Sequence, residues 1–168
     1  MTGETISEIV GRVESLHLHS STGRQEMLTV DRVELVESKG ILGESRYFGR
    51  VSADGQPNKR QLSIIEREQI AGHATQCGLP GIPPGVVRSN IETSGIELGR
   101  YMDRDVQIGE AVVHFHSPRT PCEQMNAICQ GLKEMMENGK QGVMATIVRS
   151  GAVKVGDPVR VLPAGKLG

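Results

Sequence analysis

Cysteine 122 lies where a strand should give way to a helix, in the segment SPRTPCE at residues 117–123. Residues 106–115 alternate apolar and polar types, a pattern typical of a β-strand, whereas apolar residues recur at helical spacing over residues 122–138. A thiol at a helix N-terminus lies in a positive partial field that favours the thiolate, the form that attacks sulfur or binds a soft metal. The alternative is that Cys122 is a small buried hydrophobic residue.

The other two cysteines, Cys77 and Cys129, are expected to pack in the core. Three cysteines without a secretion signal indicate a reducing cytoplasm rather than a disulfide framework. Cys129 follows Cys122 by two turns of the predicted helix, too far for an unstrained disulfide between them. A zinc ribbon is not expected, because the sequence has no CxxC spacing.

The histidines form two pairs with i, i+2 spacing, and each pair faces one side of a predicted strand. His114 and His116 end near the cysteine loop, so one of them could donate a proton to a substrate. A metal site there has no evident third ligand. His17 and His19 on the first strand have less support, and His73 is expected on the surface of a short helix.

The bulk composition excludes several classes of function. A net charge of −1, a sequence pI near 6.5, two Phe, two Tyr and no Trp argue against a nucleic-acid-binding surface. The sequence has no apolar run long enough to span a bilayer and begins with polar and acidic residues, so we expect no membrane segment and a cytoplasmic location.

We predict a single domain over residues 1–168 with its core at about 9–162, mainly β and closed or nearly closed as a barrel, with two or three peripheral helices. The 21 glycines separate short alternating segments, as frequent turns require. The expected strands or extended pieces are residues 9–18, 27–36, 60–65, 87–93, 97–101, 106–115, 143–150 and 153–162. Residues 66–77 and 122–138 are the expected helices.

Six motifs, in order along the chain, resemble the MOSC domain, the module named after the C-terminal part of molybdenum cofactor sulfurase. They are GILGE at residues 40–44, RQLSII at 60–65, RSNI at 88–91 with Gly95 after it, VQIGEA at 106–111, PRTPC at 118–122 and GAVKVGDPV at 151–159. The resemblance implies a β-barrel that binds molybdenum cofactor, or carries sulfur, through a single cysteine, which is Cys122 here.

The same resemblance implies two kinds of partner. In the sulfurases this domain follows a pyridoxal-phosphate cysteine desulfurase, so pyridoxal phosphate would act here only through a partner protein. In amidoxime-reducing relatives the matching cysteine ligates molybdenum, and single-domain bacterial members are associated with reduction of N-hydroxylated bases. An electron-transfer protein would then be needed, because the sequence has no flavin, haem or iron–sulfur signature.

The candidate cofactor-binding residues carry charges or hydrogen-bonding groups that suit an anionic pterin. Arg88 could make a bidentate contact to its phosphate, Asn90 could bond the pterin edge, and Arg119 could favour the thiolate or hold the anion. Arg60 is a weaker candidate for the same face, and Glu44 is also a candidate cofactor-binding residue. The alternatives are a surface ion pair of Arg88 with Glu92 or Glu97, a turn cap at Asn90 and a solvated charge cluster around Arg60.

One departure from the family concerns acid–base chemistry. Many members carry Gly-Asp-x-x-His after the glycine turn, and this sequence has Gly43, Glu44, Ser45, Arg46 and Tyr47 instead. Glu44 keeps the carboxylate, while the histidine is absent unless Arg46 or Tyr47 replaces it. Three hypotheses follow: a cofactor-binding or sulfur-carrying module, a molybdoenzyme that reduces N-hydroxylated compounds, or a binding scaffold without chemistry.

Overall fold

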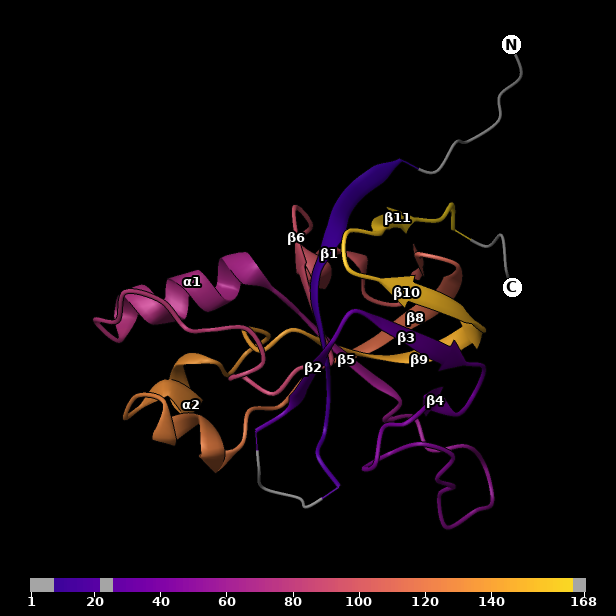
Figure 1. Ribbon diagram of the computed structural model, residues 1–168, viewed down its shortest axis with the longest axis horizontal. Helices are drawn as coiled ribbons and strands as arrows, with labels where there is room; N and C mark the ends of the chain where they lie inside the picture. Colours follow the sequence, from indigo (N-terminus) through magenta and orange to yellow (C-terminus); the bar gives the residue numbers. More distant parts are fainter. Residues whose placement is uncertain (1–7, 22–25, 165–168) are drawn as a thin grey trace.

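The computed structural model describes residues 8–21 and 26–164 and shows a β-barrel with its helices gathered on one side (Figure 1). Within this part of the chain, seven strands form a closed ring in the order β11-β7-β8-β9-β5-β6-β1, and β1 pairs back to β11. Their bounds are β1 Ile9–Leu18, β5 Leu62–Glu66, β6 Ile91–Ser94, β7 Asp105–Ile108, β8 Ala111–Pro118, β9 Val143–Arg149 and β11 Pro158–Val161. The predicted barrel is confirmed.

Two smaller groups of strands complete the sheets. β2, Leu28–Val30, extends the ring strand β1, and a separate three-stranded sheet joins β10 (Gly151–Lys154), β3 (Arg32–Val36) and β4 (Gly40–Ile41). The second sheet lies against β8 and β9. The predicted strand at residues 27–36 is thus divided at Asp31, whose carbonyl accepts a hydrogen bond from Val155 N–H.

The pairing of β5 with β6 is parallel, unlike the other pairs of the ring, and helix α1 (Arg67–Gln76) connects them. All five residues of β5 are buried, as expected for a strand covered on both faces. Cys77 caps the end of the helix, and the next residue, Gly78, has a φ of 71°, in the left-handed region. This connection confirms the predicted helix at residues 66–77 to within one residue.

The barrel and the helical side have separate hydrophobic cores. The barrel interior includes Phe115, Leu16 and Ile64, each fully buried. The second core packs Ile65 and Ile70 against Met125, Leu132 and Met136 from the segment after β8. The helical side therefore holds in place the segment that carries Cys122.

Two predicted extended segments are wrong. The expected strand at 106–115 is a hairpin, β7 and β8, because Gly109 takes a φ of 56° between paired Ile108 and Ala111. A Cβ at Gly109 would lie 2.8 Å from the Ala152 carbonyl oxygen, so only glycine fits there. The extended piece expected at 97–101 contains instead a 3₁₀ helix, η1, Leu98–Tyr101.

The predicted helix at 122–138 is also interrupted. It consists of a 3₁₀ helix η2, Glu123–Ala127, and a short helix α2, Leu132–Met135, separated at Gly131 with a φ of 88°. The expected helix N-terminus at Cys122 is therefore only that of a short 3₁₀ helix, and its field is correspondingly small.

Cys77 and Cys129 pack against the second core, as expected. The expectation that the chain has no disulfide framework was wrong, and so was the surface position expected for His73. Cys77 after α1 and Cys129 before α2 form a disulfide, with their Cα atoms 6.0 Å apart. The sequence separation of 52 residues hid this contact, which the packing of the two helical segments creates. His73 is buried, and its ring Nε2 lies 2.8 Å from the Lys140 carbonyl oxygen.

Across residues 8–21 and 26–164, no helix is both long and apolar enough to cross a membrane.

Candidate functional site

A cavity of about 110 Å³ opens beside Cys122 and is surrounded by positive charge. Its walls come from the residue after β1, the loop after β4, the start of β5, the residues before β6, the segment after β8, and β9. The lining residues are His19, Arg46, Tyr47, Arg60, Ser63, Arg88, Asn90, Arg119, Cys122, Gln124 and Met144. Chain segments distant in sequence thus converge on one thiol.

Cys122 carries the only free thiol among the residues the structure describes, and it is exposed. The alternative interpretation, a small buried hydrophobic residue, is wrong. Pro121 is buried directly before it, and Met125 is buried after it, so both sides of Cys122 are anchored. Its Sγ lies 3.7 Å from Gln124 Oε1. A held, accessible thiol of this kind can serve as nucleophile or soft ligand.

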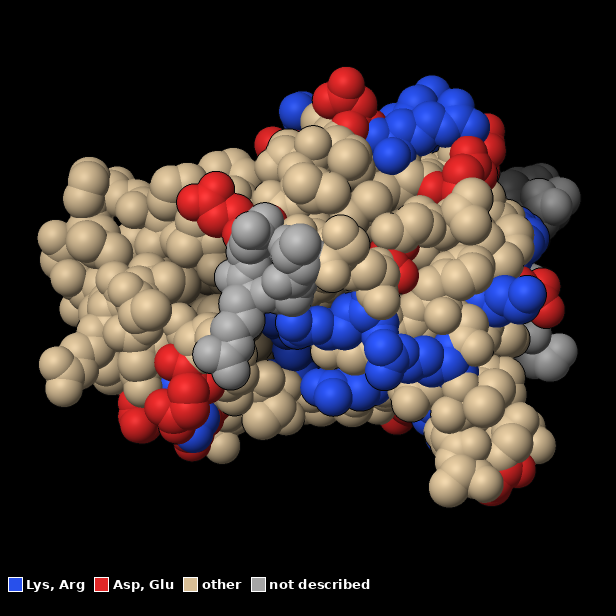
Figure 2. Space-filling view, turned by 60° about the horizontal axis from the view of Figure 1, so that its bottom comes forward, with Lys and Arg blue, Asp and Glu red and all other residues tan. Residues whose placement is uncertain are grey.

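Four arginines line the same cavity: Arg46, Arg60, Arg88 and Arg119. Burial lowers the pKa of Arg119 to about 10, while the nearby Cys122 acts in the opposite direction. Burial and the neighbouring charge of Arg46 also lower the pKa of Arg88. Both guanidinium groups remain charged near neutral pH, so the cavity attracts anions. Figure 2 shows a gathering of Lys and Arg side chains on one face of the molecule.

Arg119 fixes the backbone that presents Arg88. Its Nη1 and Nη2 donate to the carbonyl oxygens of Val87 and Arg88, at 3.2 and 2.8 Å. Arg88 itself has a φ of 65°, which is costly for a residue with a side chain and persists only where the surroundings enforce it. A guanidinium has five N–H donors, so Arg119 keeps donors for a ligand after making these two bonds.

Glu44 does not line the cavity but forms hydrogen bonds with two residues that do, His19 and Asn90. Its carboxylate accepts hydrogen bonds from Asn90 Nδ2 at 2.7 Å and from His19 Nδ1 at 2.9 Å. Burial alone would raise the pKa of Glu44, but the bonds from His19 and Asn90 outweigh it and leave the pKa below its usual value. An ionised Glu44 only accepts, so His19 Nδ1 carries the proton of this hydrogen bond.

Asn90 is held on every side by the protein. Its Oδ1 accepts from the N–H and hydroxyl of Ser63, both at 3.1 Å, and its Nδ2 also donates to the His17 carbonyl at 3.1 Å. These bonds orient Glu44 and tie β5 to the start of β6. The turn-cap interpretation of Asn90 does not describe this arrangement.

The structure brings the predicted site residues together. Five of them line the cavity: Cys122, Arg88, Asn90, Arg119 and Arg60. The sixth, Glu44, accepts a hydrogen bond from Asn90. The carboxylate Glu92, considered as a partner of Arg88, is bonded to Arg67 at 2.6 Å. Arg60 stacks on the Tyr47 ring, with its Cζ 5.6 Å from the centroid.

The histidine that lines the cavity, His19, belongs to the pair with less support from the sequence. His19 is buried beside Cys122's cavity, and its ring meets Tyr47 edge-on with centroids 6.0 Å apart. His114 instead bonds Asp105 at 2.8 Å, and His116 Nε2 lies 2.8 Å from the Lys59 carbonyl oxygen. His19 comes directly after β1 and is 25 residues away from Glu44 in the sequence. It becomes part of the site only because the fold brings these two residues together.

The family model of the MOSC domain matches residues 43–160, which is more than half of the sequence. The chain belongs to the MOSC family. This family is associated with molybdenum cofactor binding. Comparison with curated proteins gives no significant match.

Solved structures share the same fold. The YuaD protein of Bacillus subtilis superposes with a TM-score of 0.73 at 20% identity, covering 93% of this chain and 98% of that one. YiiM of Escherichia coli gives a TM-score of 0.65 at 21% identity, covering 90% of this chain and 70% of that one. YiiM of Geobacillus stearothermophilus gives 0.63 at 15% identity, with coverages of 96% and 77%. At these identities the likeness concerns the fold.

The donor set of the site suits an anionic, thiolate-seeking ligand rather than a bare cation. Among the described residues, no three His, Cys, Asp or Glu side chains are grouped to hold a metal ion by themselves. One thiol surrounded by guanidinium groups instead matches a metal centre that brings its own anionic ligands, such as a pterin dithiolene with a phosphate.

Proposed function

We propose that this MOSC protein binds molybdenum cofactor, or accepts sulfur as a persulfide, through Cys122. The observation that carries the proposal is the exposed thiol at the edge of a cavity lined by four arginines. A persulfide and a cofactor phosphate are both anionic, so one positive cavity would stabilise either of them.

The size of the cavity indicates which part of a cofactor it would take. At about 110 Å³ it is smaller than the 300–1,000 Å³ typical of small-molecule sites, so it suits a charged end group rather than a whole pterin. Arg88 also lines a second cavity of about 440 Å³, with Pro83, Pro84 and Val86 on its walls. An elongated ligand could therefore contact Arg88 from both spaces.

Each residue has a distinct part in this proposal. Cys122 would be the ligand to molybdenum or the carrier of sulfur, and Arg88, Arg119 and Arg60 would hold the anion. Asn90 and Glu44 would keep this end of β5 and β6 in place. The bound cofactor would supply a molybdenum centre for oxygen-atom or sulfur chemistry.

For sulfur carriage the chain needs a donor. The Cys122 thiolate would attack the terminal sulfur of a persulfide on a cysteine desulfurase, whose own S–S bond breaks and whose cysteine leaves as a thiolate. The pyridoxal phosphate would belong to that partner. Cytoplasmic location, where such partners occur, is part of the same proposal.

A second candidate is reduction of N-hydroxylated compounds with electrons from another protein. His19 favours it, because this ring lines the cavity with Cys122 and Glu44 fixes its proton on Nδ1. Cleavage of an N–O bond consumes protons, and a protonated His19 Nε2 would be placed to deliver one. The histidine missing from the Gly-Asp-x-x-His pattern would thus have a replacement from another strand.

Molybdenum content tests the proposal directly. Wild type and Cys122→Ser are expressed in a host that makes the cofactor, purified without oxygen, and compared by elemental analysis. Near-stoichiometric molybdenum in the wild type and a loss of at least tenfold in Cys122→Ser would support Cys122 as ligand. Gln130→Ala serves as a control, because it changes an exposed residue of the same segment that lies outside the cavity and leaves the disulfide intact.

The same samples test sulfur carriage by intact mass. A mass increase of one sulfur atom on Cys122, formed with a cysteine desulfurase and cysteine, would support the carrier role. Absence of both molybdenum and persulfide would overturn the proposal and favour a binding scaffold without chemistry. Consumption of an amidoxime with a reconstituted electron donor, lost in Cys122→Ser, would decide for the second candidate.

A further inference from the structure

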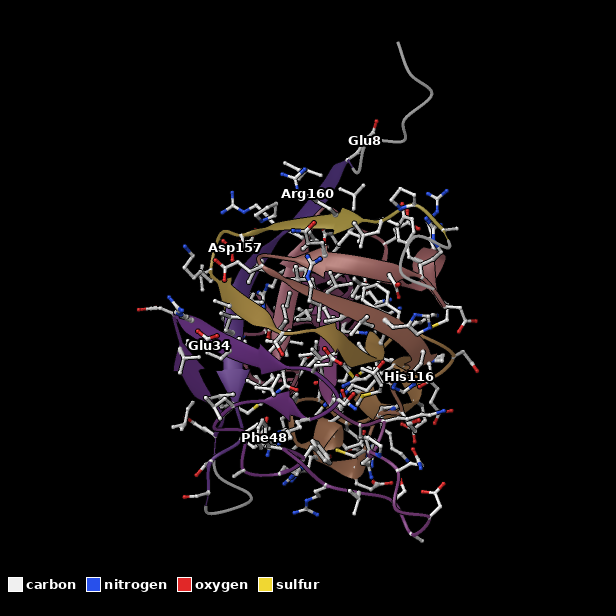
Figure 3. All side chains as sticks on the ribbon, turned by 90° about the vertical axis from the view of Figure 1, so that its right-hand side faces the viewer. Glu8, Glu34, Phe48, His116, Asp157 and Arg160 are labelled. Carbon is white, nitrogen blue, oxygen red and sulfur yellow. A yellow bond between two sulfur atoms is a disulfide. The ribbon has the colours of Figure 1, made fainter. Side chains whose placement is uncertain are left out.

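A third cavity, of about 550 Å³, lies at the opposite end of the barrel from Cys122. Val10 near the start of β1 lines it, whereas His19 just after the end of β1 lines the cavity of Cys122. Nine residues of strand separate these two positions by up to about 30 Å. Figure 3 shows the two ends, with Glu8 and Arg160 at one and Phe48 and His116 towards the other.

The charge of this cavity is opposite to that of the first. Glu66 at the end of β5, Glu68 in α1 and Glu97 before η1 all line it, together with one cation, Arg100. The apolar part of the wall comes from Val10, Ile96 and the ring of Tyr101. Three carboxylates against one guanidinium leave a negative concavity within the typical volume range of small-molecule sites.

Glu66 is the residue that most requires a ligand. It is 6% exposed, and its Oε1 is buried without a hydrogen-bond partner among the described residues. A buried acceptor in that state carries a desolvation cost, and such groups need an explanation. The neighbouring cation, Arg67, has other partners: its Nη1 donates to Glu92 at 2.6 Å and its Nη2 donates to the Ile82 carbonyl oxygen at 3.2 Å.

The neighbours of Glu66 also work against its charge. Burial, and then the charges of Glu68 and Glu97, raise its pKa to about 7, although the backbone N–H groups of Glu66 and Leu98 act in the other direction. Glu68 has one partner in this wall, the Gly95 N–H at 2.8 Å from Oε2. A positive ligand in the cavity that Glu66 lines would relieve the repulsion among the three carboxylates.

The arrangement of the carboxylates decides which kind of cation fits. Within the described residues these glutamates do not form a group able to hold a metal ion. Carboxylates that share a wall with an aromatic residue, here Tyr101, suit a cation with several N–H donors and an apolar body. We propose that this cavity binds a small organic ammonium or guanidinium compound, with Glu66 as its buried anchor.

The test uses n-butylguanidinium, with the neutral n-butylurea as a probe of nearly the same shape. Both are titrated into ¹⁵N-labelled protein at pH 8, and amide shifts are followed by NMR. We expect n-butylguanidinium to give saturable shifts at Gly95, Ile96 and Leu98, and n-butylurea to give none. Equal shifts from both compounds, or shifts only at the Cys122 cavity, would overturn the proposal.

Two variants separate the anchor from general surface charge. Glu66→Gln keeps the shape of the side chain, and we expect it to weaken n-butylguanidinium binding at least tenfold while the remaining amide spectrum stays that of the folded wild type. Glu134→Gln removes one exposed negative charge from α2, outside this cavity, and should change the affinity by less than twofold. Equal weakening in both variants, or none in Glu66→Gln, would reject Glu66 as the anchor.

Discussion

At the scale of single residues, the site depends on groups that position other groups. Asn90 and Glu44 come from motifs the sequence identifies, but their role as ligands of a cofactor remains a prediction. The hydrogen bonds that the structure shows connect these residues to other protein side chains: Asn90 Nδ2 donates to Glu44, and Glu44 accepts from His19. The sequence could supply the residue types, but the choice of His19 over His114 or His116 depends on the register of β1 beside β6, which only the folded barrel shows.

The carboxylate of Glu44 should stabilise the fold in a pH-dependent way. Its pKa is lowered on folding, so its contribution is present above the unfolded value of 4.5 and is lost as the pH falls through the folded value. We expect Glu44→Gln to lose about 2 kcal/mol of unfolding free energy at pH 7, the scale of hydrogen bonds to a charged group. Urea denaturation at pH 7 and pH 3.5 measures this, and the loss should shrink at the lower pH. A loss of equal size at both would contradict the charge-based explanation.

Arg88 permits a separation of backbone strain from ligand binding. Its φ of 65° is easily adopted by glycine, so Arg88→Gly should stay within about 1 kcal/mol of wild-type stability. The same change removes a guanidinium from the cavity and should weaken inorganic phosphate binding about tenfold, which calorimetry measures. Arg149→Gln, an exposed arginine at the end of β9, is the matched loss of charge. If both variants bound phosphate alike, Arg88 would not be an anion ligand.

At the scale of elements, residues 122–138 show what periodicity can and cannot predict. The apolar positions of the segment do face one core, with Met125, Leu132 and Met136 buried, as the helical spacing indicated. The continuity of the helix fails at Gly131, since its φ of 88° breaks the helical backbone. Cys129, two residues before this break, forms the disulfide with Cys77, a contact that no local pattern could predict.

The disulfide should be the main tie between α1 and the segment that follows Cys122. Closing a loop of 52 residues restricts the unfolded chain, and we expect its removal to cost about 3–4 kcal/mol. Cys129→Ala should show this in urea denaturation under non-reducing conditions, and dithiothreitol should lower the wild type to a similar stability. Cys122→Ala is the control, because its thiol is free and exposed. If dithiothreitol left the urea midpoint of the wild type unchanged, the disulfide would contribute nothing to stability.

At the scale of the whole molecule, short alternating segments separated by glycines were enough to predict a β-barrel. Closure itself depends on the antiparallel pairing of β1 with β11, which lie at opposite ends of the described chain. The hairpin at Gly109 was missed because Val106 to Phe115 alternate without a polar turn sequence of the usual kind. The folded barrel also separates charge: arginines collect around Cys122, and Glu66, Glu68 and Glu97 collect at the other end.

The acidic end should limit stability at neutral and alkaline pH. Burial raises the pKa of Glu66 from 4.5 to about 7, so the folded state binds this proton more tightly than the unfolded state, and the contribution of Glu66 becomes unfavourable as the pH rises through that window. Glu66→Gln does not titrate. After allowance for solvent screening, we expect it to be more stable than wild type by about 1 kcal/mol at pH 8, or roughly 2–4 °C in Tm. At pH 4.5 the two proteins should melt together, because Glu66 is then protonated in the folded state. Thermal unfolding of both at these two pH values measures the difference, and a Glu66→Gln variant less stable than wild type at pH 8 would show that the carboxylate is already compensated inside the fold.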